Sequence, residues 1–460
     1  MGPWARRRPR PGRCPALPPA LGRRSRPGPG AAGVRHLEPR PGPEEDGAVK
    51  PASRVARPAP PPISGHQDTL DGVRAVAALG ILVYHVAATA GSITNPAGPR
   101  WLFNGGQVGV PIFFALSGLL LYRPWAAAVL DGRAAPRVGV YLRKRVFRIM
   151  PAYWALIVCF MLTAGRDHIG DPVSWISLLT LTQTYLPNMW WETALGPAHL
   201  GQLWSLVVEV AWYVTLPFTA AVLGWYARRK RTGDVGVRAK RLLIGIGVYG
   251  ALSFPYTAVM FFPERHGQMG LWLPRFFVWF AIGMALAVVT VWARLDERRP
   301  VAAMCRAVSD SWAACWVAAA MLYVVAATPA TGPATLQIPD EFWTSTLHLV
   351  VNGLCAAALL APVALAPAGH PALGAVLANP VMRFLGRISY GLFLWQLLII
   401  VAWYEATDRV FRGDVATDLP LMTAASIAAA TLSYYLVERP VQRLVRRDRS
   451  RRAPSPAPSS

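Results

Sequence analysis

Arg74 and His85 are the basic residues of the first long apolar run of this 460-residue chain. About three helical turns separate them, so a helix places both side chains on nearly the same side. Their separation along the helix axis is about 16 Å, around half of a hydrocarbon core that is roughly 30 Å thick. An ionisable group near the middle of a bilayer is costly and indicates a functional site. The spacing therefore predicts chemistry at membrane depth that is reached from one face.

Histidine can act as a general base because its ordinary pKa lies close to neutrality. His85 therefore has two open interpretations: a catalytic base, or a structural histidine that hydrogen-bonds to a carbonyl of a neighbouring helix. Arg74 is open in the same way. Besides a role in the site, it could be a cytoplasmic anchor or the partner of Asp71, three residues before it.

Arg145 and Arg148 lie in a basic stretch, Tyr141–Tyr153, directly before the third apolar run. Their i,i+3 spacing puts both guanidinium groups on one face of a helix. Paired guanidinium forks suit phosphate groups, which indicates a phosphate-binding role. The alternative is topogenic charge that contacts lipid headgroups.

Glu209 is a carboxylate inside the fourth apolar run, four residues after Ser205 and on the same helix face. We expect it roughly 6 to 10 Å inside the membrane from the outer side, where a buried carboxylate needs a partner or a proton. It could orient His85 or an acceptor hydroxyl, or form a structural pair with another helix. Ser117, followed by Gly118 in the second run, is either a site of close helix packing or a nucleophile.

The composition is that of a membrane protein. Of the residues, 53% are hydrophobic and 15% are charged, whereas about 25% charge is usual in soluble proteins. The formal net charge is +23, but the basic residues lie in both tails and in alternate loops, which indicates topology rather than nucleic-acid binding. The sequence therefore predicts an all-α, polytopic membrane helix bundle. The five cysteines form no paired motif, so we expect no metal site.

Three parts follow one another along the chain. Residues 1–66 are rich in Pro, Arg and Gly and are predicted to be a disordered basic tail; residues 67–443 form the integral-membrane domain; and residues 444–460 form a second disordered basic tail. We expect no soluble domain, so any activity must lie in the bundle.

The basic loops after the second and fourth apolar runs are assigned to the cytoplasm. About ten transmembrane helices with both termini cytoplasmic fit this pattern. Counting the short run 175–185 as a span would reverse every later loop, so we interpret it as re-entrant or interfacial. The ten runs are about 74–92, 106–124, 150–165, 203–226, 241–262, 272–293, 311–328, 344–366, 384–403 and 419–438.

Six stretches occur in order along the membrane domain: LDGVRAVAALGILVYH, FFALSGLLL, RKRVFRIMPAYW, LWSLVVEVAWYVTLP, LGRISYGLFLW and YYLVERP. In this order and at this spacing they resemble the acyltransferase-3 family of bacterial integral-membrane O-acyltransferases, from about Leu70 to Arg443. The resemblance implies transfer of an acetyl or other short acyl group from a cytoplasmic acyl-CoA to a hydroxyl. The usual acceptors are extracytoplasmic glycans, and some actinobacterial relatives acylate macrolide sugars.

The resemblance also implies roles for individual residues. In that family an Arg and a His of the first helix are tied to catalysis, and they match Arg74 and His85. The Arg-x-x-Arg before the third span, which matches Arg145 and Arg148, is implied to hold the CoA phosphates. One position departs from the pattern. Where the family often has His after Leu-Trp, this chain has Gln396, so a second histidine is not required there or the acceptor differs.

We therefore expect a multi-pass enzyme of the bacterial plasma membrane, with acyl-CoA as co-substrate, no permanently bound cofactor, and a carbohydrate or glycosylated acceptor. Glu209 is included among its catalytic residues. Three alternatives stay open: acylation of a macrolide-type metabolite, a non-catalytic membrane partner of a separate enzyme, and a transporter or flippase that uses His85 as a proton relay. No inverted repeat or matched pair of broken helices supports a transporter. The acceptor, the acyl chain length and the oligomeric state are not predicted.

Overall fold

The computed structural model describes residues 61, 66–93, 98–186, 189–191, 193–229, 233–296, 300–332 and 341–444. Within these ranges every regular element is a helix and no strand occurs, which confirms the predicted all-α class. The two predicted tails, 1–66 and 444–460, lie almost wholly outside the described residues.

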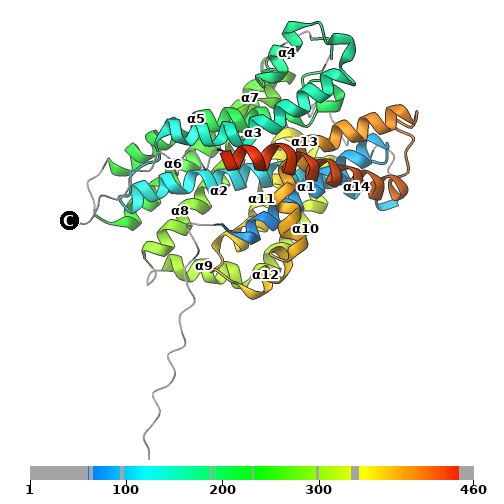
Figure 1. The fold of residues 1–460 in the computed structure, drawn as a ribbon. Helices are drawn as coiled ribbons and strands as arrows, with labels where there is room; N and C mark the ends of the chain where they lie inside the picture. Colours follow the sequence, from blue (N-terminus) through cyan, green and yellow to red (C-terminus); the bar gives the residue numbers. More distant parts are fainter. Residues whose placement is uncertain are drawn as a thin grey trace, which may run out of the picture. The chain divides into compact units, whose positions relative to one another are not determined.

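Nine helical segments of the described chain are long and apolar enough to cross a membrane. These segments form a multi-pass helical bundle (Figure 1). They are α1 (Asp68–Thr89), η1 with α2 (Gly98–Val108, Gly109–Leu130), α3 (Val138–Leu162), α5 (Leu203–Arg228), α6 with α7 (Val235–Ala251, Ser253–Phe261), η5 with α8 (Leu273–Phe276, Phe277–Leu295), α11 (Phe342–Leu365), α13 (Pro380–Ala406), and α14 (Val415–Ser433) with η7 (Tyr434–Glu438).

The predicted span at about 311–328 is paired with a second helix that the sequence did not predict. The helices α9 (Pro300–Asp310) and α10 (Trp312–Ala327) are together long enough to cross a membrane, but a bend of 66° separates them. Nine of the ten predicted spans therefore correspond to segments of full length, and the span at about 311–328 corresponds to α10, the second helix of the bent pair. Other short elements of the described chain are η2 (Arg166–His168), α4 (Pro172–Leu179), η3 (Ala198–Leu200), η4 (Gly267–Leu271), η6 (Pro329–Thr331) and α12 (Pro371–Leu377).

The short apolar run 175–185 forms no span. The helix that begins it, α4, has 8 residues, too few to cross a bilayer. Asp171 caps α4 by accepting hydrogen bonds from the backbone N–H groups of Val173 and Ser174 and from the Ser174 hydroxyl. These bonds, the one from the Ser174 hydroxyl above all, hold the pKa of Asp171 below its ordinary value.

The backbones of α2 and α8 approach each other closely. A Cβ on Gly118 would lie 2.3 Å from the carbonyl oxygen of Phe280, and a Cβ on Gly283 would lie 1.8 Å from that of Ala115. Such distances are possible because glycine carries no side chain. The close packing predicted at Ser117–Gly118 is therefore confirmed.

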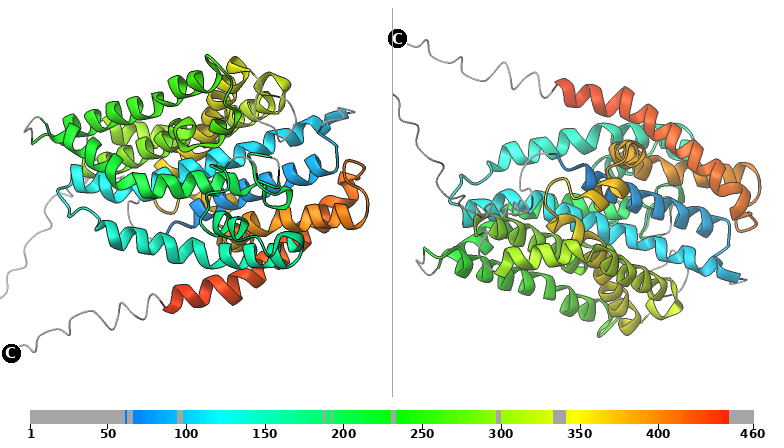
Figure 2. Two further views of the ribbon diagram at one scale, coloured as in Figure 1. Left: turned by 90° about the horizontal axis from the view of Figure 1, so that it is seen from above. Right: turned by 90° about the horizontal axis from the view of Figure 1, so that it is seen from below.

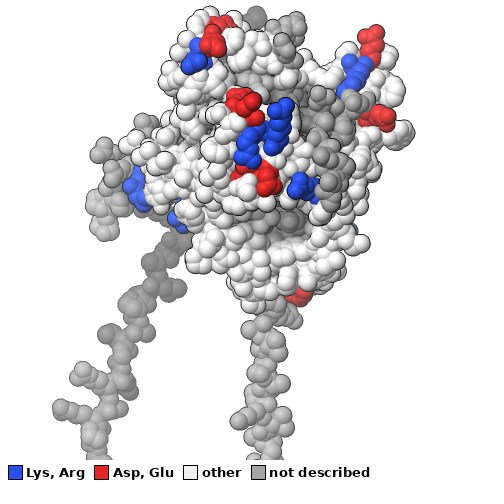
Figure 3. Space-filling view, turned by 90° about the vertical axis from the view of Figure 1, so that its right-hand side faces the viewer, with Lys and Arg blue, Asp and Glu red and all other residues white. Residues whose placement is uncertain are grey.

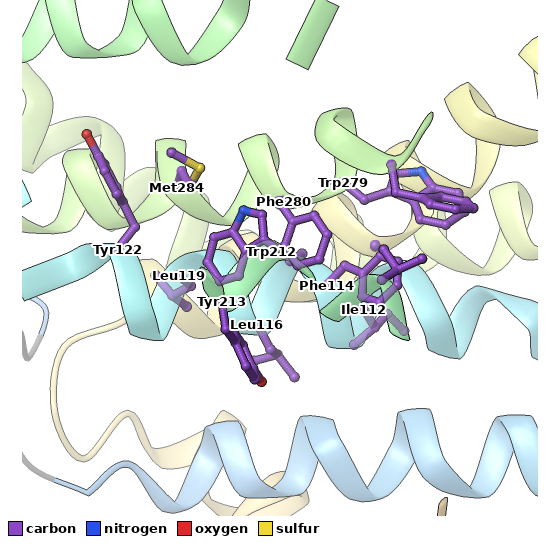
Figure 4. Packing of buried hydrophobic residues seen from close by; sticks show 14 of the residues in the cluster. Ile112, Phe114, Leu116, Leu119, Tyr122, Trp212, Tyr213, Trp279, Phe280 and Met284 are labelled. Carbon is purple, nitrogen blue, oxygen red and sulfur yellow. The ribbon is translucent and has the colours of Figure 1, made fainter. Parts of the chain in front are cut away.

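Aromatic rings fill the space beside this contact. Phe114 of α2 stacks on Phe280 of α8 with ring centroids 4.6 Å apart, and Trp212 of α5 stacks on Phe280 at 4.5 Å. Figure 4 shows these rings between the three helices, with Tyr213 on the side of α5 that turns toward α1. The aromatic layer fixes the rotation of α5 about its axis and with it the direction of its polar residues.

The helices α1 and α13 lie side by side and run in the same direction (Figure 2). Near their starts, a Cβ on Gly386 would lie 2.2 Å from the carbonyl oxygen of Asp71. Beyond their other ends, the N–H of Phe411 donates to the carbonyl of Thr89 at 2.9 Å. Because one contact joins the two starts and the other joins the two ends, α1 and α13 are parallel.

The end of the bundle that carries the α13–α14 connection has charged side chains of both signs. On the face shown in Figure 3, basic and acidic side chains form small mixed groups on a largely uncharged surface. Arg409 forms an ion pair with Asp418 at 3.1 Å, and the buried Asp418 also accepts a hydrogen bond from the Tyr404 hydroxyl at 2.8 Å. These contacts tie the connection to both helices.

Candidate functional site

Arg74 lies in the second turn of α1 and forms an ion pair with Asp71, with Nη1 2.5 Å from Oδ1. The side chains of Arg74 and Asp71 are 20% and 10% exposed, so the pair is largely enclosed. Asp71 also contacts His66 at 2.9 Å. The pairing with Asp71 is thus present, and it leaves part of the Arg74 guanidinium facing the interior, where Arg148 and Tyr213 interact with it electrostatically.

Arg145 and Arg148 are one turn apart on α3 and belong to the same polar region. Arg145 interacts electrostatically with Glu209 and Tyr213 of α5, while Arg148 interacts with Arg74 of α1. Arg148 remains exposed, whereas Arg145 is partly buried. The two arginines therefore connect an exposed position with the interior of the bundle.

Glu209 accepts hydrogen bonds from the Ser117 hydroxyl of α2 and the Tyr213 hydroxyl of α5. The structure thus gives the Ser117 hydroxyl a carboxylate partner, Glu209, on another helix. The hydrogen bond to Tyr213 is an i,i+4 contact within α5, so the side chain of Glu209 is held from two helices. Together, Arg74, Arg145, Arg148, Glu209 and Tyr213 form what we call the arginine cluster.

Two further residues lie in this region, Tyr390 and Glu438, and neither was assigned a role from the sequence. Tyr390 of α13 donates to the carbonyl of Ile149 at 2.8 Å and interacts electrostatically with Glu209 and Glu438. Glu438, which is buried, interacts electrostatically with Arg148. Two features of the sequence lie at these positions: the many polar residues of the LGRISY stretch, and the Glu-Arg-Pro sequence at the end of the last run. Neither feature shows which helix the stretch packs against.

His85 lies further along α1, about 16 Å from Arg74 along the helix axis. It is 6% exposed, and its Nδ1 has no hydrogen-bond partner among the described residues. Its ring contacts the Tyr84 ring with centroids 5.4 Å apart. The hydrogen bonds of Glu209 go to Ser117 and Tyr213, not to His85. The structure therefore joins four predicted residues in one cluster and places His85 apart from them on the shared helix.

The arrangement suits an anionic ligand at one end and proton transfer at the other. Three guanidinium groups from α1 and α3 are accompanied by three carboxylates, Asp71, Glu209 and Glu438, and Asp71 also contacts His66. Each guanidinium has five N–H donors, so these arginines can bind phosphate oxygens in addition to the carboxylates. His85 offers an unpaired imidazole nitrogen in a site closed to bulk solvent. Within the described residues, no group of three or more His, Cys, Asp or Glu side chains could hold a metal ion.

The helix bundle and the arginine cluster together define an integral-membrane protein with a basic site between its helices. A family profile described as an acyltransferase domain matches residues 67–438. The chain belongs to this acyltransferase family.

The chain is also similar to individual members of the family. Peptidoglycan O-acetyltransferase OatA of Listeria monocytogenes is 24% identical over 388 residues, which cover 82% of this chain and 56% of that protein. YrhL of Bacillus subtilis, provisionally named a peptidoglycan O-acetyltransferase, is 25% identical over 409 residues, 83% of this chain and 56% of YrhL. The chain thus spans little more than half the length of these relatives. No solved structure matches the chain significantly.

Proposed function

We propose that the protein is an acyl-CoA-dependent O-acyltransferase that moves an acetyl or other short acyl group to a hydroxyl of a carbohydrate or glycosylated acceptor. The observation that carries the proposal is the arginine cluster, because it gathers basic side chains from α1 and α3 inside an apolar bundle. Family membership supports acyl transfer. The names of the relatives support a glycan acceptor.

In this proposal the CoA phosphates bind to Arg145 and Arg148, with Arg74 as a third cation. Arg148 is exposed and can meet the nucleotide first, while Arg145 and Arg74 lie deeper. Guanidinium groups bind phosphate oxygens in pairs, which also fixes the direction of the bound molecule. The pantetheine arm then extends along α1 toward His85.

His85 acts as the general base. Its unpaired Nδ1 accepts the proton of the acceptor hydroxyl while the hydroxyl oxygen attacks the thioester carbonyl carbon. The new C–O ester bond forms, the C–S bond breaks, and the CoA thiolate leaves and takes up the proton from His85. No acyl-enzyme intermediate is required.

Glu209 has a supporting role in this scheme. It balances the charge of Arg145 and holds the hydroxyls of Ser117 and Tyr213. A carboxylate at this place keeps the three arginines from repelling one another before CoA binds. Glu209 therefore acts on CoA binding rather than on the hydroxyl that reacts.

The decisive experiment uses His85→Ala in membranes that contain the full chain, with isotope-labelled acetyl-CoA. We expect loss of acyl transfer with an unchanged amount of protein in the membrane. His266→Ala is the matched control because His266 is exposed and lies outside the cluster; it should keep wild-type activity. Full activity in His85→Ala would show that the base lies elsewhere.

The transporter alternative predicts substrate movement without covalent change. The described chain contains one bent helix pair, α9–α10, whereas transporters of the inverted-repeat type use matched broken helices in both halves. Macrolide-type acceptors remain within the proposed reaction, because a glycosylated macrolide offers the same sugar hydroxyls. Product analysis by mass spectrometry after deletion of the gene separates these outcomes.

A further inference from the structure

A glutamine at the middle of α13 is buried without hydrogen bonds. Gln396 is 0% exposed, and neither its Nε2 nor its Oε1 has a partner among the described residues. Buried polar groups in native proteins are nearly always hydrogen-bonded, and each exception needs an explanation. A side-chain amide with both of its polar atoms unpaired is ready to bind a ligand that offers one donor and one acceptor.

The packing of α1 against α13 brings Gln396 close in height to His85. Gly386 meets Asp71 near the start of both helices. From this contact, Gln396 is about 15 Å further along α13 and His85 about 21 Å further along α1. The side chains of both residues lean toward the N-termini of these parallel helices, so the offset between them stays about 6 Å, roughly one helical turn.

Both residues belong to the junction of α1, α2 and α13. A Cβ on Gly109 of α2 would lie 2.5 Å from Ile81, one turn before His85 on the same face of α1. Phe113 of α2 contacts Phe393 of α13 with centroids 6.5 Å apart, one turn before Gln396. The same junction therefore holds the unpaired imidazole nitrogen and the unpaired amide.

A third unpaired group comes from the start of α5. Gln202, 3% exposed, donates from Nε2 to the carbonyl of Leu394 at 2.9 Å, while its Oε1 has no partner among the described residues. Leu394 lies two residues before Gln396 on α13. The end of the loop that precedes α5 is thus attached to the part of α13 that carries the free amide.

We propose that Gln396, with Gln202 beside it, forms a polar subsite that binds two adjacent oxygens of the acceptor, as hydroxyl groups on neighbouring carbons of a sugar ring provide. Gln396 Oε1 accepts from one hydroxyl, and Nε2 donates to the oxygen next to it. This contact presents a third, reacting hydroxyl to His85 Nδ1. The inference rests on the proposed acyl transfer and adds the residue that orients the acceptor.

The test compares Gln396→Leu with wild type in membranes and after purification of the full chain. The acceptor probes are short oligosaccharides of N-acetylglucosamine, glucose, galactose and mannose, and the donor is isotope-labelled acetyl-CoA. Loss of two neutral hydrogen bonds should raise KM for the acceptor roughly 10- to 100-fold, with KM for acetyl-CoA unchanged. Tm should not fall, because replacing an unpaired buried amide by an apolar side chain of similar shape is neutral or stabilising.

Gln268→Leu is the matched control. Gln268 donates from Nε2 to the carbonyl of Thr184 at 3.1 Å, so its loss should lower Tm slightly and leave the acceptor KM unchanged. An unchanged acceptor KM in Gln396→Leu would overturn the subsite, and so would a lowered Tm with all kinetic constants reduced together. If the wild type transfers acetyl to none of the probes, the result contradicts the proposed function, and with it the subsite that rests on that function.

Discussion

At the scale of single residues, the spacing of charges on α3 has a direct consequence for donor binding. Arg145 and Arg148 share the face that meets α1 and α5, whereas Arg143 is exposed on the same helix and has no partner in the arginine cluster. The proposed phosphate contacts therefore involve Arg145 and Arg148 but not Arg143, although all three arginines lie within two turns of α3.

We predict that Arg145→Gln and Arg148→Gln each raise KM for acetyl-CoA roughly 10- to 100-fold, the effect of losing one charge-assisted hydrogen bond to phosphate. The effect on kcat should be smaller, because neither residue reaches the reacting hydroxyl. Initial rates over a range of acetyl-CoA concentrations measure the change. Arg143→Gln is the control and should resemble wild type; an equal loss in all three variants would indicate a general effect of charge on the membrane surface.

The sequence anticipated which side of each helix is polar, but not which helices meet. The i,i+3 spacing of Arg145 and Arg148 and the position of Glu209 follow from helix periodicity alone. That Ser117 donates to Glu209 depends on how α2 and α5 lie relative to each other. Their relative position is set through α8, because Phe280 of α8 stacks on both Phe114 of α2 and Trp212 of α5. Such contacts depend on shape and cannot be read from hydrophobic periodicity.

At the scale of helices, glycine decides how closely α2 and α8 pack. A Cβ on Gly283 would lie 1.8 Å from a carbonyl oxygen of α2, and it would meet backbone that cannot rotate away. On α6, by contrast, a Cβ on Gly247 would meet nothing within 4 Å. The two positions provide a test of the packing in which the same substitution is made in both environments.

Gly283→Ala should force α2 and α8 apart and destabilise the protein by about 1–3 kcal/mol or more. Because α2 carries Ser117, the same change should loosen the contact with Glu209 and lower acyl-transfer activity. Gly247→Ala should be neutral or stabilise by up to about 1 kcal/mol, because alanine is the better helix former. Thermal unfolding of the purified variants, followed by tryptophan fluorescence, measures both. Equal Tm values for the two variants would contradict the close approach.

The places of the apolar runs were predicted because a run of about 20 apolar residues has few other solutions. The length of α3 was not, because this helix begins at Val138, in the basic stretch before the predicted run 150–165. The helix α9 and its bend against α10 were not predicted, because Pro300–Asp310 lies between the predicted runs 272–293 and 311–328. The residues on both sides of the bend favour helix, and the bend becomes visible only when α9 and α10 are placed against their neighbours. The ten predicted spans compare with nine continuous segments of the described chain, or ten if the bent pair counts as one span.

At the scale of the whole molecule, the parallel packing of α1 and α13 determines whether the bent pair α9–α10 crosses the membrane. A chain that leaves α1 at one face and enters α13 at the opposite face must cross the membrane an odd number of times in between. The continuous segments between them are α2, α3, α5, α6 with α7, α8 and α11, an even number. The α9–α10 pair must therefore supply the remaining crossing.

This argument predicts the side of the connection between α11 and α12. In a chain whose native cysteines are replaced by alanine, single cysteines are placed at Ala134, Ala368 and Ala406, all of which are exposed. A maleimide that cannot cross membranes should label Ala406→Cys in intact cells and should reach Ala134→Cys and Ala368→Cys only after permeabilisation. Labelling of Ala368→Cys in intact cells, with Ala134→Cys protected, would mean that α9–α10 does not cross. In that case α13 would run opposite to α1, against the contacts of Gly386 with Asp71 and of Phe411 with Thr89.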